Sequence, residues 1–203
     1  MAQAKGYGDP HGYNAPLGTE TYVFRSNGIV PNSSLPLIVR RGAVSPSEHD
    51  AVRTFKATFA RNGWTNAWID GIHDFHHYHS NAHEVLGIVS GSARVRFGGA
   101  DGDLVGVTAG DVVVIPAGVA HACIEASDDF AVVGAYPNGS DYDTIRDDPG
   151  ALAASQQRIA QVPVPDADPV DGADGPLVKL WTCEREDPPT VESRCCETMP
   201  DAP

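Results

Sequence analysis

The sequence has few cysteines, few basic residues and no long apolar run, and each shortage excludes a class of protein. Only four cysteines occur among 203 residues. They lack the spacing of a zinc site, and the adjacent Cys195 and Cys196 make a poor disulfide framework, so we expect a protein of the reducing cytoplasm. No apolar segment has the length of a membrane-spanning helix. The N-terminus also lacks the apolar stretch of a signal peptide.

Basic residues are scarce enough to argue against two kinds of partner. Lysine and arginine total 14, against 27 aspartates and glutamates, which gives a net charge of −13 at pH 7. Residues 1–124 are nearly balanced, whereas residues 125–203 hold 17 acidic and 5 basic side chains. Neither part has the basic stripe that binds phosphate backbones, so nucleic-acid binding is disfavoured. An acidic surface also disfavours anionic membranes, and we interpret the acidic part as solvated surface.

The chain is rich in glycine and proline, which interrupt helices and favour short strands joined by turns. There are 21 glycines and 16 prolines. Short segments rich in β-branched residues alternate with turn residues, as in a β-sandwich or barrel. The expected strands span residues 20–25, 35–41, 64–70, 74–79, 84–90, 93–97, 104–107, 112–115, 120–126 and 130–136. The sequence therefore predicts an all-β domain.

Outside these strands, the sequence predicts two helices and two irregular ends. Val52, Phe55 and Phe59 recur at helical spacing, which predicts an amphipathic helix over residues 46–62 that packs on the outside of a sheet. Residues 45–48 have the pattern of a capping box with proline at the first helical position. A second helix is expected near residues 152–161. Residues 1–18 are expected to be a flexible lead, 19–178 one domain, and 179–203 an acidic, proline-rich, disordered tail.

Five of the eight histidines lie within residues 73–83, a concentration that a structural core does not require. Histidine is the commonest metal ligand. His77 and His79 are two residues apart, so on a strand both face the same way. Glu84 needs a turn or bulge over residues 80–82 to reach that face, and His121 opens a later strand after a proline–glycine turn. Three imidazoles and one carboxylate would then bind a divalent transition metal with one or two coordination positions left open.

These residues resemble the two sequence motifs of the cupin superfamily. The first motif, G-x5-H-x-H-x4-E-x6-G, is matched by Gly71, His77, His79, Glu84 and Gly91. The second motif, G-x5-P-x-G-x2-H-x3-N, is matched by Gly110, Pro116, Gly118 and His121, with Glu125 in place of the final asparagine. Two motifs in the right order, with all the ligand types present, make this a specific resemblance.

A closer resemblance is to the YjlB-like family of single-domain bacterial cupins. It is carried by residues 63–66, 76–80, 83–87 and 130–137, and it extends from Thr19 to Leu177. The resemblance implies a cupin jelly-roll β-barrel, with one N-terminal amphipathic helix and a C-terminal extension. It also implies a metal inside the barrel, held by His77, His79, Glu84 and His121, and a possible homodimer. The family has no settled reaction.

Residues beyond the four ligands are weaker candidates for function. His76, Tyr136 and Glu125 are the candidates for catalytic roles: His76 by its place beside the ligands, Tyr136 by its place after the last strand, and Glu125 because strand parity puts it on the His121 face. His83 is expected to point away from the ligands and to serve packing. His73 is a candidate for the mouth of the pocket.

The resemblance implies three classes of function. The first is a metal-dependent dioxygenase of small-molecule metabolism, with iron as the expected metal. The second is a metal-dependent isomerase, lyase or decarboxylase, and the third is a non-catalytic module that binds a small ligand. Manganese, nickel, zinc or copper would also suit the donor set.

Overall fold

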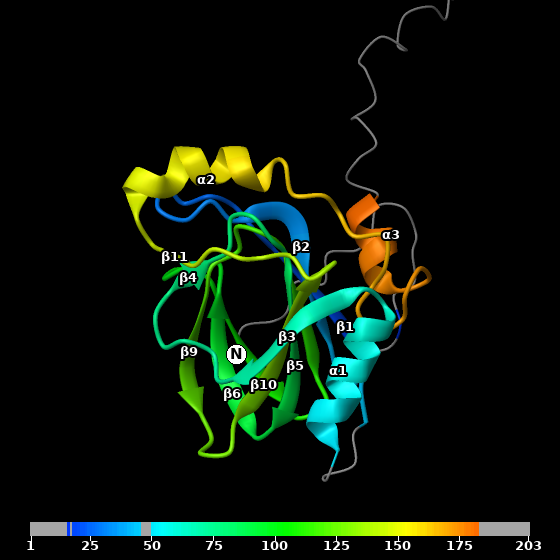
Figure 1. Ribbon diagram of the computed structural model, residues 1–203. Coiled ribbons are helices and arrows are strands. Elements are labelled where there is room, and N and C mark those ends of the chain that lie inside the picture. Colours follow the sequence, from blue (N-terminus) through cyan, green and yellow to red (C-terminus); the bar gives the residue numbers. More distant parts are fainter. Residues whose placement is uncertain (1–15, 17, 46–49, 183–203) are drawn as a thin grey trace, which may run out of the picture.

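The computed structural model describes residues 16, 18–45 and 50–182 (Figure 1). Eleven strands in these residues form two antiparallel sheets. The six-stranded sheet has the order β1-β2-β8-β5-β10-β3, and the five-stranded sheet has the order β11-β4-β9-β6-β7. The strands are β1 (Thr19–Phe24), β2 (Ser33–Arg40), β3 (Trp64–Asp70), β4 (His77–Tyr78), β5 (Glu84–Ser90), β6 (Ser92–Phe97), β7 (Asp103–Thr108), β8 (Val112–Ile115), β9 (His121–Ala126), β10 (Ala131–Pro137) and β11 (Ile145–Arg146). This is the predicted all-β jelly roll.

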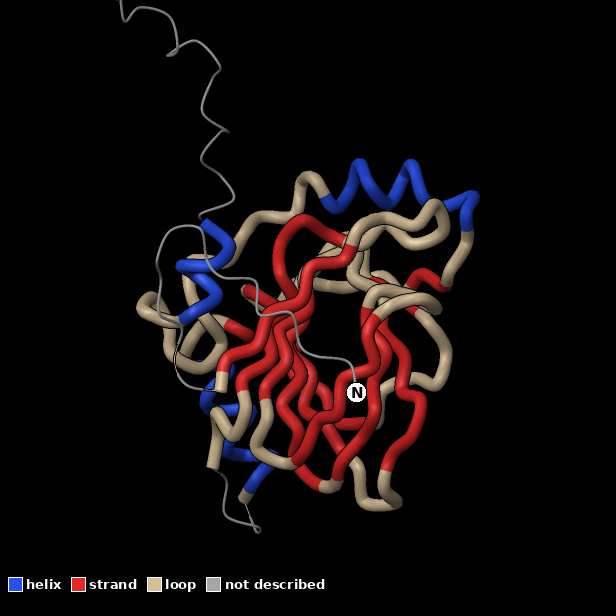
Figure 2. Tube along the Cα trace, turned by 180° about the vertical axis from the view of Figure 1, so that it is seen from behind, coloured by secondary structure: helices blue, strands red, loops and turns tan. Residues whose placement is uncertain are grey.

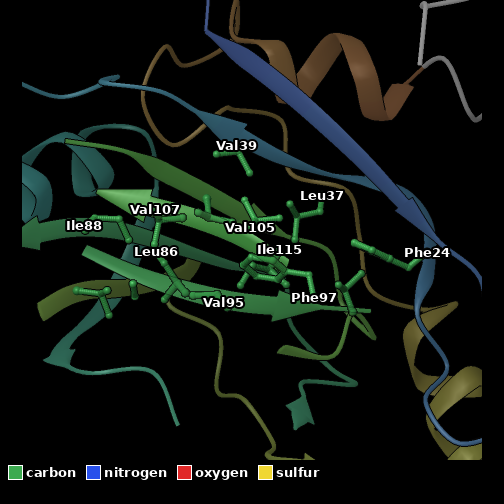
Figure 3. Close-up of a cluster of buried hydrophobic side chains, with 14 residues drawn as sticks. Phe24, Leu37, Val39, Leu86, Ile88, Val95, Phe97, Val105, Val107 and Ile115 are labelled. Carbon is green, nitrogen blue, oxygen red and sulfur yellow. The ribbon is translucent and has the colours of Figure 1, made fainter. Parts of the chain in front are cut away.

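The main core lies between the two sheets (Figures 2 and 3). Alternation along the strands builds it: in β6, Ala93, Val95 and Phe97 are buried while Ser92 and Arg94 are exposed. Valine, leucine and isoleucine from β2, β5 and β8 of the other sheet supply most of the opposing side chains, and Val105 and Val107 of β7 extend the core beside β6 (Figure 3). Because aromatic residues are few, this interior is mainly aliphatic.

A second core lies on the outer face of the six-stranded sheet, where helix α1 (Ala51–Arg61) packs. Phe55 and Phe59 are fully buried there, as the helical spacing predicts. Gly87 of β5 is required at this contact, because a Cβ atom on it would lie 2.3 Å from the Phe55 ring. Most of the expected capping box falls on residues 46–49, which lie outside the described residues, and the described helix begins at Ala51.

Two further α-helices and a short 3-10 helix, Pro149–Ala151, complete the described chain. Helix α2 (Leu152–Ile159) agrees with the expected helix and lies across one end of the sandwich, near β4 and β11 (Figure 1). Helix α3 (Pro176–Thr182) was not expected, and it covers the outer core beside α1. The domain boundary expected at residue 178 falls inside α3. The expected flexible lead and the rest of the tail, residues 183–203, lie outside the described residues, apart from residues 16 and 18. Among the described helices, none combines the length and the apolar character that a membrane span needs.

Trp181 ties α3 to the domain, and we expect its replacement by alanine to destabilise the fold by about 3–5 kcal/mol. Its side chain is fully buried and its indole Nε1 donates to the Pro36 carbonyl oxygen at 2.9 Å. Denaturant unfolding measures the change, with the exposed neighbour Thr182→Ala as the control. A loss below about 1 kcal/mol for Trp181→Ala would show that α3 is not part of the cooperative domain.

Candidate metal centre

Three histidine side chains meet at one end of the sandwich. His77 lies on β4 and is paired across the sheet with His121, the first residue of β9. His79 follows β4 on the same side of the chain, and one ring nitrogen from each of the three lies within 4.8 Å of the others. All three side chains are buried. The predicted convergence of the three imidazoles is therefore present in the structure.

Glu84 reaches the same point from the opposite sheet, because it is the first residue of β5. Its Oε2 atom lies 3.4 Å from His79 Nε2 and 3.4 Å from His121 Nε2. The chain bends at Ser80 and Asn81, between His79 and Glu84, and crosses there from one sheet to the other. The four residues thus join the two sheets at the end of the barrel.

Backbone carbonyls orient all three imidazoles in the same way. The Nδ1 atom of His77 lies 3.1 Å from the Phe75 oxygen, and that of His121 lies 3.3 Å from the Val119 oxygen. The Nδ1 atom of His79 contacts the Asp143 oxygen. A carbonyl only accepts, so each Nδ1 carries the proton and each Nε2 has a free lone pair when the ring is neutral. This is the tautomer that binds a metal through Nε2.

Burial keeps two of these imidazoles neutral. It lowers the pKa of His77 to about 4 and that of His121 to about 3, in the latter case with a further contribution from the neighbouring His77. For His79, burial lowers the pKa of the imidazole, but Glu84 and Asp143 together outweigh burial and raise that pKa. Burial also opposes the charge on Glu84, but His79 outweighs it and lowers the pKa of the carboxyl to about 2. The site therefore offers a carboxylate and, in His77 and His121, two neutral imidazoles near neutral pH, whereas the carboxylate of Glu84 favours a proton on His79.

The two oxygens of Glu84 have different surroundings. Oε1 accepts a hydrogen bond from the Tyr136 hydroxyl at 2.8 Å, and that hydroxyl in turn accepts from Trp68 Nε1 at 2.8 Å. Burial and the Glu84 charge raise the pKa of Tyr136, so it stays protonated and donates. Oε2 is buried and makes no hydrogen bond among the described residues. A buried carboxylate oxygen without a hydrogen-bond donor, facing two imidazole Nε2 atoms, fits a bound cation.

Gly134 explains how Trp68 reaches Tyr136. Gly134 of β10 is paired with Trp68 of β3. A Cβ atom on Gly134 would lie 2.2 Å from the Trp68 indole, so only glycine lets the ring lie flat against β10. A register shift between Gly134 and Tyr136 then places the Tyr136 hydroxyl beside the indole nitrogen.

A cavity of about 270 Å³ begins at these four residues. Its walls come from β3, β5 and β10, from the loop after β3, and from the segment after β10. The lining residues other than the four are Trp68, Ile69, Asp70, Gly71, Ile72, His73, Leu86, Tyr136, Tyr142 and Thr144. A small molecule in this cavity would touch the four residues directly.

Comparison with known proteins places the chain in a family. A family model described as cupin matches residues 74–150. The uncharacterized protein YjlB of Bacillus subtilis (strain 168) is 38% identical over 164 residues, which are 80% of this chain and 96% of that protein. The chain belongs to the YjlB-like cupins.

Solved structures resemble this cupin over parts of their length. Acireductone dioxygenase from Bacillus anthracis, with a cadmium ion in its active centre, is 19% identical, with a TM-score of 0.36 over 63% of this chain and 83% of that chain. Oxalate decarboxylase from Bacillus subtilis, described with Mn(II) centres, is 18% identical, with a TM-score of 0.34 over 58% of this chain and 29% of that one. Procruciferin from Brassica napus is 22% identical, with a TM-score of 0.31 over 41% of this chain, which spans 20% of that protein's length.

Loop residues that the cupin motifs do not include also belong to the site. We name residues 138–144, which follow β10, the strap. Asp143 of the strap accepts from His79 Nδ1 through its carbonyl and from the Ser80 backbone N–H through its carboxylate, the latter at 2.6 Å. Arg158 of α2 donates to the Ser80 hydroxyl at 2.6 Å. The strap thus contacts His79 directly, and helix α2 contacts the next residue, Ser80.

The structure places the other candidate residues in different surroundings. Tyr136 lies in the site, next to Glu84. Glu125 is exposed and pairs with Arg94 at 3.3 Å, because a register shift between β6 and β9 reverses the expected strand parity. His76 is half-buried and is not among the residues that line the cavity. His83 points away from the site, where its Nδ1 accepts from the Ala117 N–H at 2.9 Å and its ring packs on Trp181.

His73 and Cys123 occupy positions near the site. The His73 ring is exposed at the edge of the cavity, where it stacks on Phe75 with ring centres 4.6 Å apart. Cys123 is half-buried and packs against the main core between the sheets. Two residues of the site, Tyr142 and Asp143, were missed by sequence reasoning because no periodicity or motif marks a contact made by an irregular loop.

Replacing Tyr136 by phenylalanine is expected to weaken metal binding about 10- to 100-fold, as is usual when a hydrogen bond to a ligand is removed. The phenyl ring preserves packing but leaves Glu84 Oε1 without its donor. Competition with a chromophoric chelator measures the metal affinity. Tyr142→Phe is the matched control, because no hydrogen bond links the Tyr142 hydroxyl to Glu84 among the described residues. Equal affinity for the two variants would remove Tyr136 from the site's function.

Proposed function

We propose that this cupin is a metal-dependent enzyme of small-molecule metabolism, and specifically an iron-dependent dioxygenase. We also propose that it works in the cytoplasm. We propose His77, His79, Glu84 and His121 as the ligands. The observation that carries the proposal is the unpartnered Oε2 atom of Glu84, buried beside the Nε2 atoms of His79 and His121. A cation at this point would take the place of a hydrogen-bond donor to that oxygen and would balance the buried carboxylate charge.

The donor set supports a catalytic metal more than a structural one. Structural zinc sites are closed by four ligands, often with cysteine thiolates. Here the donors are nitrogen and oxygen atoms, and they stand at the end of a cavity that a small molecule can enter. A ferrous ion held there would supply the activation of dioxygen. The protein's own contribution is to hold the ligands rigidly and to surround the reacting molecule with aromatic and aliphatic walls.

The scarcity of free acids and bases in the cavity favours oxidation over isomerase, lyase or decarboxylase chemistry. Those reactions need a positioned side chain that moves a proton. The Tyr136 hydroxyl is already bonded to Glu84, and Asp70 is exposed and accepts from the Gly71 N–H at 2.7 Å. His73 stands at the rim with its ring against Phe75. Besides the four proposed ligands, the titratable groups of the described lining are Asp70 and His73 at its exposed edge and the phenols of Tyr136 and Tyr142.

Elemental analysis tests the proposal on protein purified without oxygen and without an immobilised-metal column. Near-stoichiometric iron, followed by substrate-dependent oxygen uptake, would support the dioxygenase. Zinc, nickel or manganese with turnover that consumes no oxygen would replace it by an isomerase, lyase or decarboxylase. Protein that takes up no metal, even when divalent ions are supplied, would overturn the proposal.

A further inference from the structure

The walls of the metal-site cavity are aromatic and aliphatic. Trp68 and Tyr136 form one wall, and the Tyr142 ring stacks on Tyr136 with centres 4.2 Å apart and planes inclined by 18°. The same Tyr142 ring lies edge-on to His79, with centres 5.1 Å apart. Leu86 and Ile72 complete the apolar lining. A ligand that extends from the four ligand residues therefore meets ring faces and hydrocarbon.

The described lining of the cavity has no side chain with a permanent positive charge to receive a second negative charge. Among the described residues that line it, none is lysine or arginine, whereas Asp70 and Glu84 are acidic. Arginines on neighbouring elements are engaged elsewhere: Arg146 lies 3.7 Å above the Phe75 ring, and Arg158 is bonded to Ser80. A carboxylate or phosphate on the far side of a ligand would lose its water without gaining a cation, which is costly.

Two hydrogen-bond donors of the wall, those of Trp68 and Tyr136, are also directed away from such a group. Trp68 Nε1 donates to Tyr136, and the Tyr136 hydroxyl donates to Glu84. Both donors therefore serve the glutamate. The volume of about 270 Å³ lies just below the usual range for small-molecule pockets of about 300–1,000 Å³. The space suits a single ring rather than a nucleotide or a fused ring system.

We propose that the ligand of this cavity is a small planar molecule of the phenol or enol class, uncharged away from its metal-binding oxygens, and that Tyr142 is the residue that selects it. This rests on the proposed function, since the metal holds the oxygen end. The ring of the ligand packs against Tyr142. A planar apolar ring gains stacking and dispersion contacts there, whereas a remote anion meets no lysine or arginine in the described lining.

The strap makes Tyr142 suitable for this role. Its side chain is 41% exposed and so has room to contact an incoming molecule. The backbone on either side is held, because Asn81 Nδ2 donates to the Asp141 oxygen at 3.3 Å and the Asp143 N–H donates to Asn81 Oδ1 at 2.9 Å. At the mouth of the cavity, the Tyr142 side chain can therefore change its orientation while its backbone stays in place.

The test is calorimetric titration of the full chain, loaded with Co²⁺, with a matched pair of catechols. Protocatechuate carries a carboxylate opposite its two oxygens, and protocatechuamide has nearly the same shape without the charge. We expect the amide to bind at least about tenfold more tightly. Equal binding, or tighter binding of the acid, would overturn the proposed ligand class.

Variants of Tyr142 test the second half of the proposal. Tyr142→Ala should weaken amide binding about fivefold or more while leaving the affinity for azide, which is too small to reach the ring, unchanged. Tyr142→Phe should bind the amide as the wild type does. Equal amide affinity in Tyr142→Ala and wild type would remove Tyr142 from the proposal. Failure to take up Co²⁺ would be detected before any ligand is added, and would overturn the proposed function together with the inference built on it.

Discussion

Replacing His121 by alanine is expected to reduce the metal content of the purified protein from near-stoichiometric to near zero, and His77→Ala to do the same. Both imidazoles are buried, and their proposed ligand atoms lie within 4.8 Å of each other and of the His79 nitrogen. Alanine has no atom that can bind a metal, so each variant lacks one of the four proposed ligands. Inductively coupled plasma mass spectrometry on anaerobically purified protein measures the effect.

The matched control for these variants is His73→Ala. His73 belongs to the same histidine cluster, but its ring is exposed at the rim and stacks on Phe75. We expect His73→Ala to keep its metal. Circular dichroism should show that all three variants are folded. Full metal content in either His77→Ala or His121→Ala would contradict the ligand assignment.

The metal-free protein is expected to lose several kcal/mol of unfolding free energy as the pH falls from about 6.5 to about 4. Burial lowers the pKa of His77 and His83 to about 4 and that of His121 to about 3. In this pH window these three histidines bind protons in the unfolded chain but stay neutral in the folded chain. Each such group therefore removes about 1.4 kcal/mol of stability per pH unit. The raised pKa of His79 acts in the opposite direction, but it is one group against three.

Urea unfolding of chelator-treated protein at pH 7.5 and pH 5 measures this loss. The informative variant is His83→Gln, because His83 lies outside the metal site and glutamine still offers an acceptor for the Ala117 N–H. We expect this variant to take up about one proton fewer on unfolding at acid pH. Its unfolding free energy should therefore fall less steeply with pH, by about 1.4 kcal/mol per pH unit. Equal unfolding free energies at the two pH values would show that these histidines titrate normally in the fold.

The fold followed from the sequence wherever the determining pattern was local. Strands β5 and β8 have the predicted bounds because runs of β-branched residues end at clear turns. The helical spacing of Phe55 and Phe59 correctly predicted the amphipathic helix and its place on the outside of a sheet. The predicted strand over residues 74–79 is shorter, since only His77 and Tyr78 pair with neighbouring strands.

The convergence of the three histidines was also predictable, because residues two apart on a strand share a face and the cupin motif spacing relates them to the strand that His121 opens. Glu84 could be placed with them by motif only, because strand parity does not carry through the bend at Ser80 and Asn81, where the chain crosses to the other sheet. Parity failed for Glu125, where a register shift that no local pattern reveals turns the carboxylate to solvent.

The sequence by itself determined the all-β class, the amphipathic helix and, through the resemblance to cupins, the jelly roll and the histidines that meet, because periodicity and motif spacing act over a few residues. Only the tertiary structure decided the rest of the site: the Trp68–Tyr136–Glu84 hydrogen bonds, the strap over His79, and the docking of Trp181. These contacts join residues about 50 to 150 positions apart. Such contacts depend on how the two sheets and the loops pack against each other, and the spacing of nearby residues does not predict that packing.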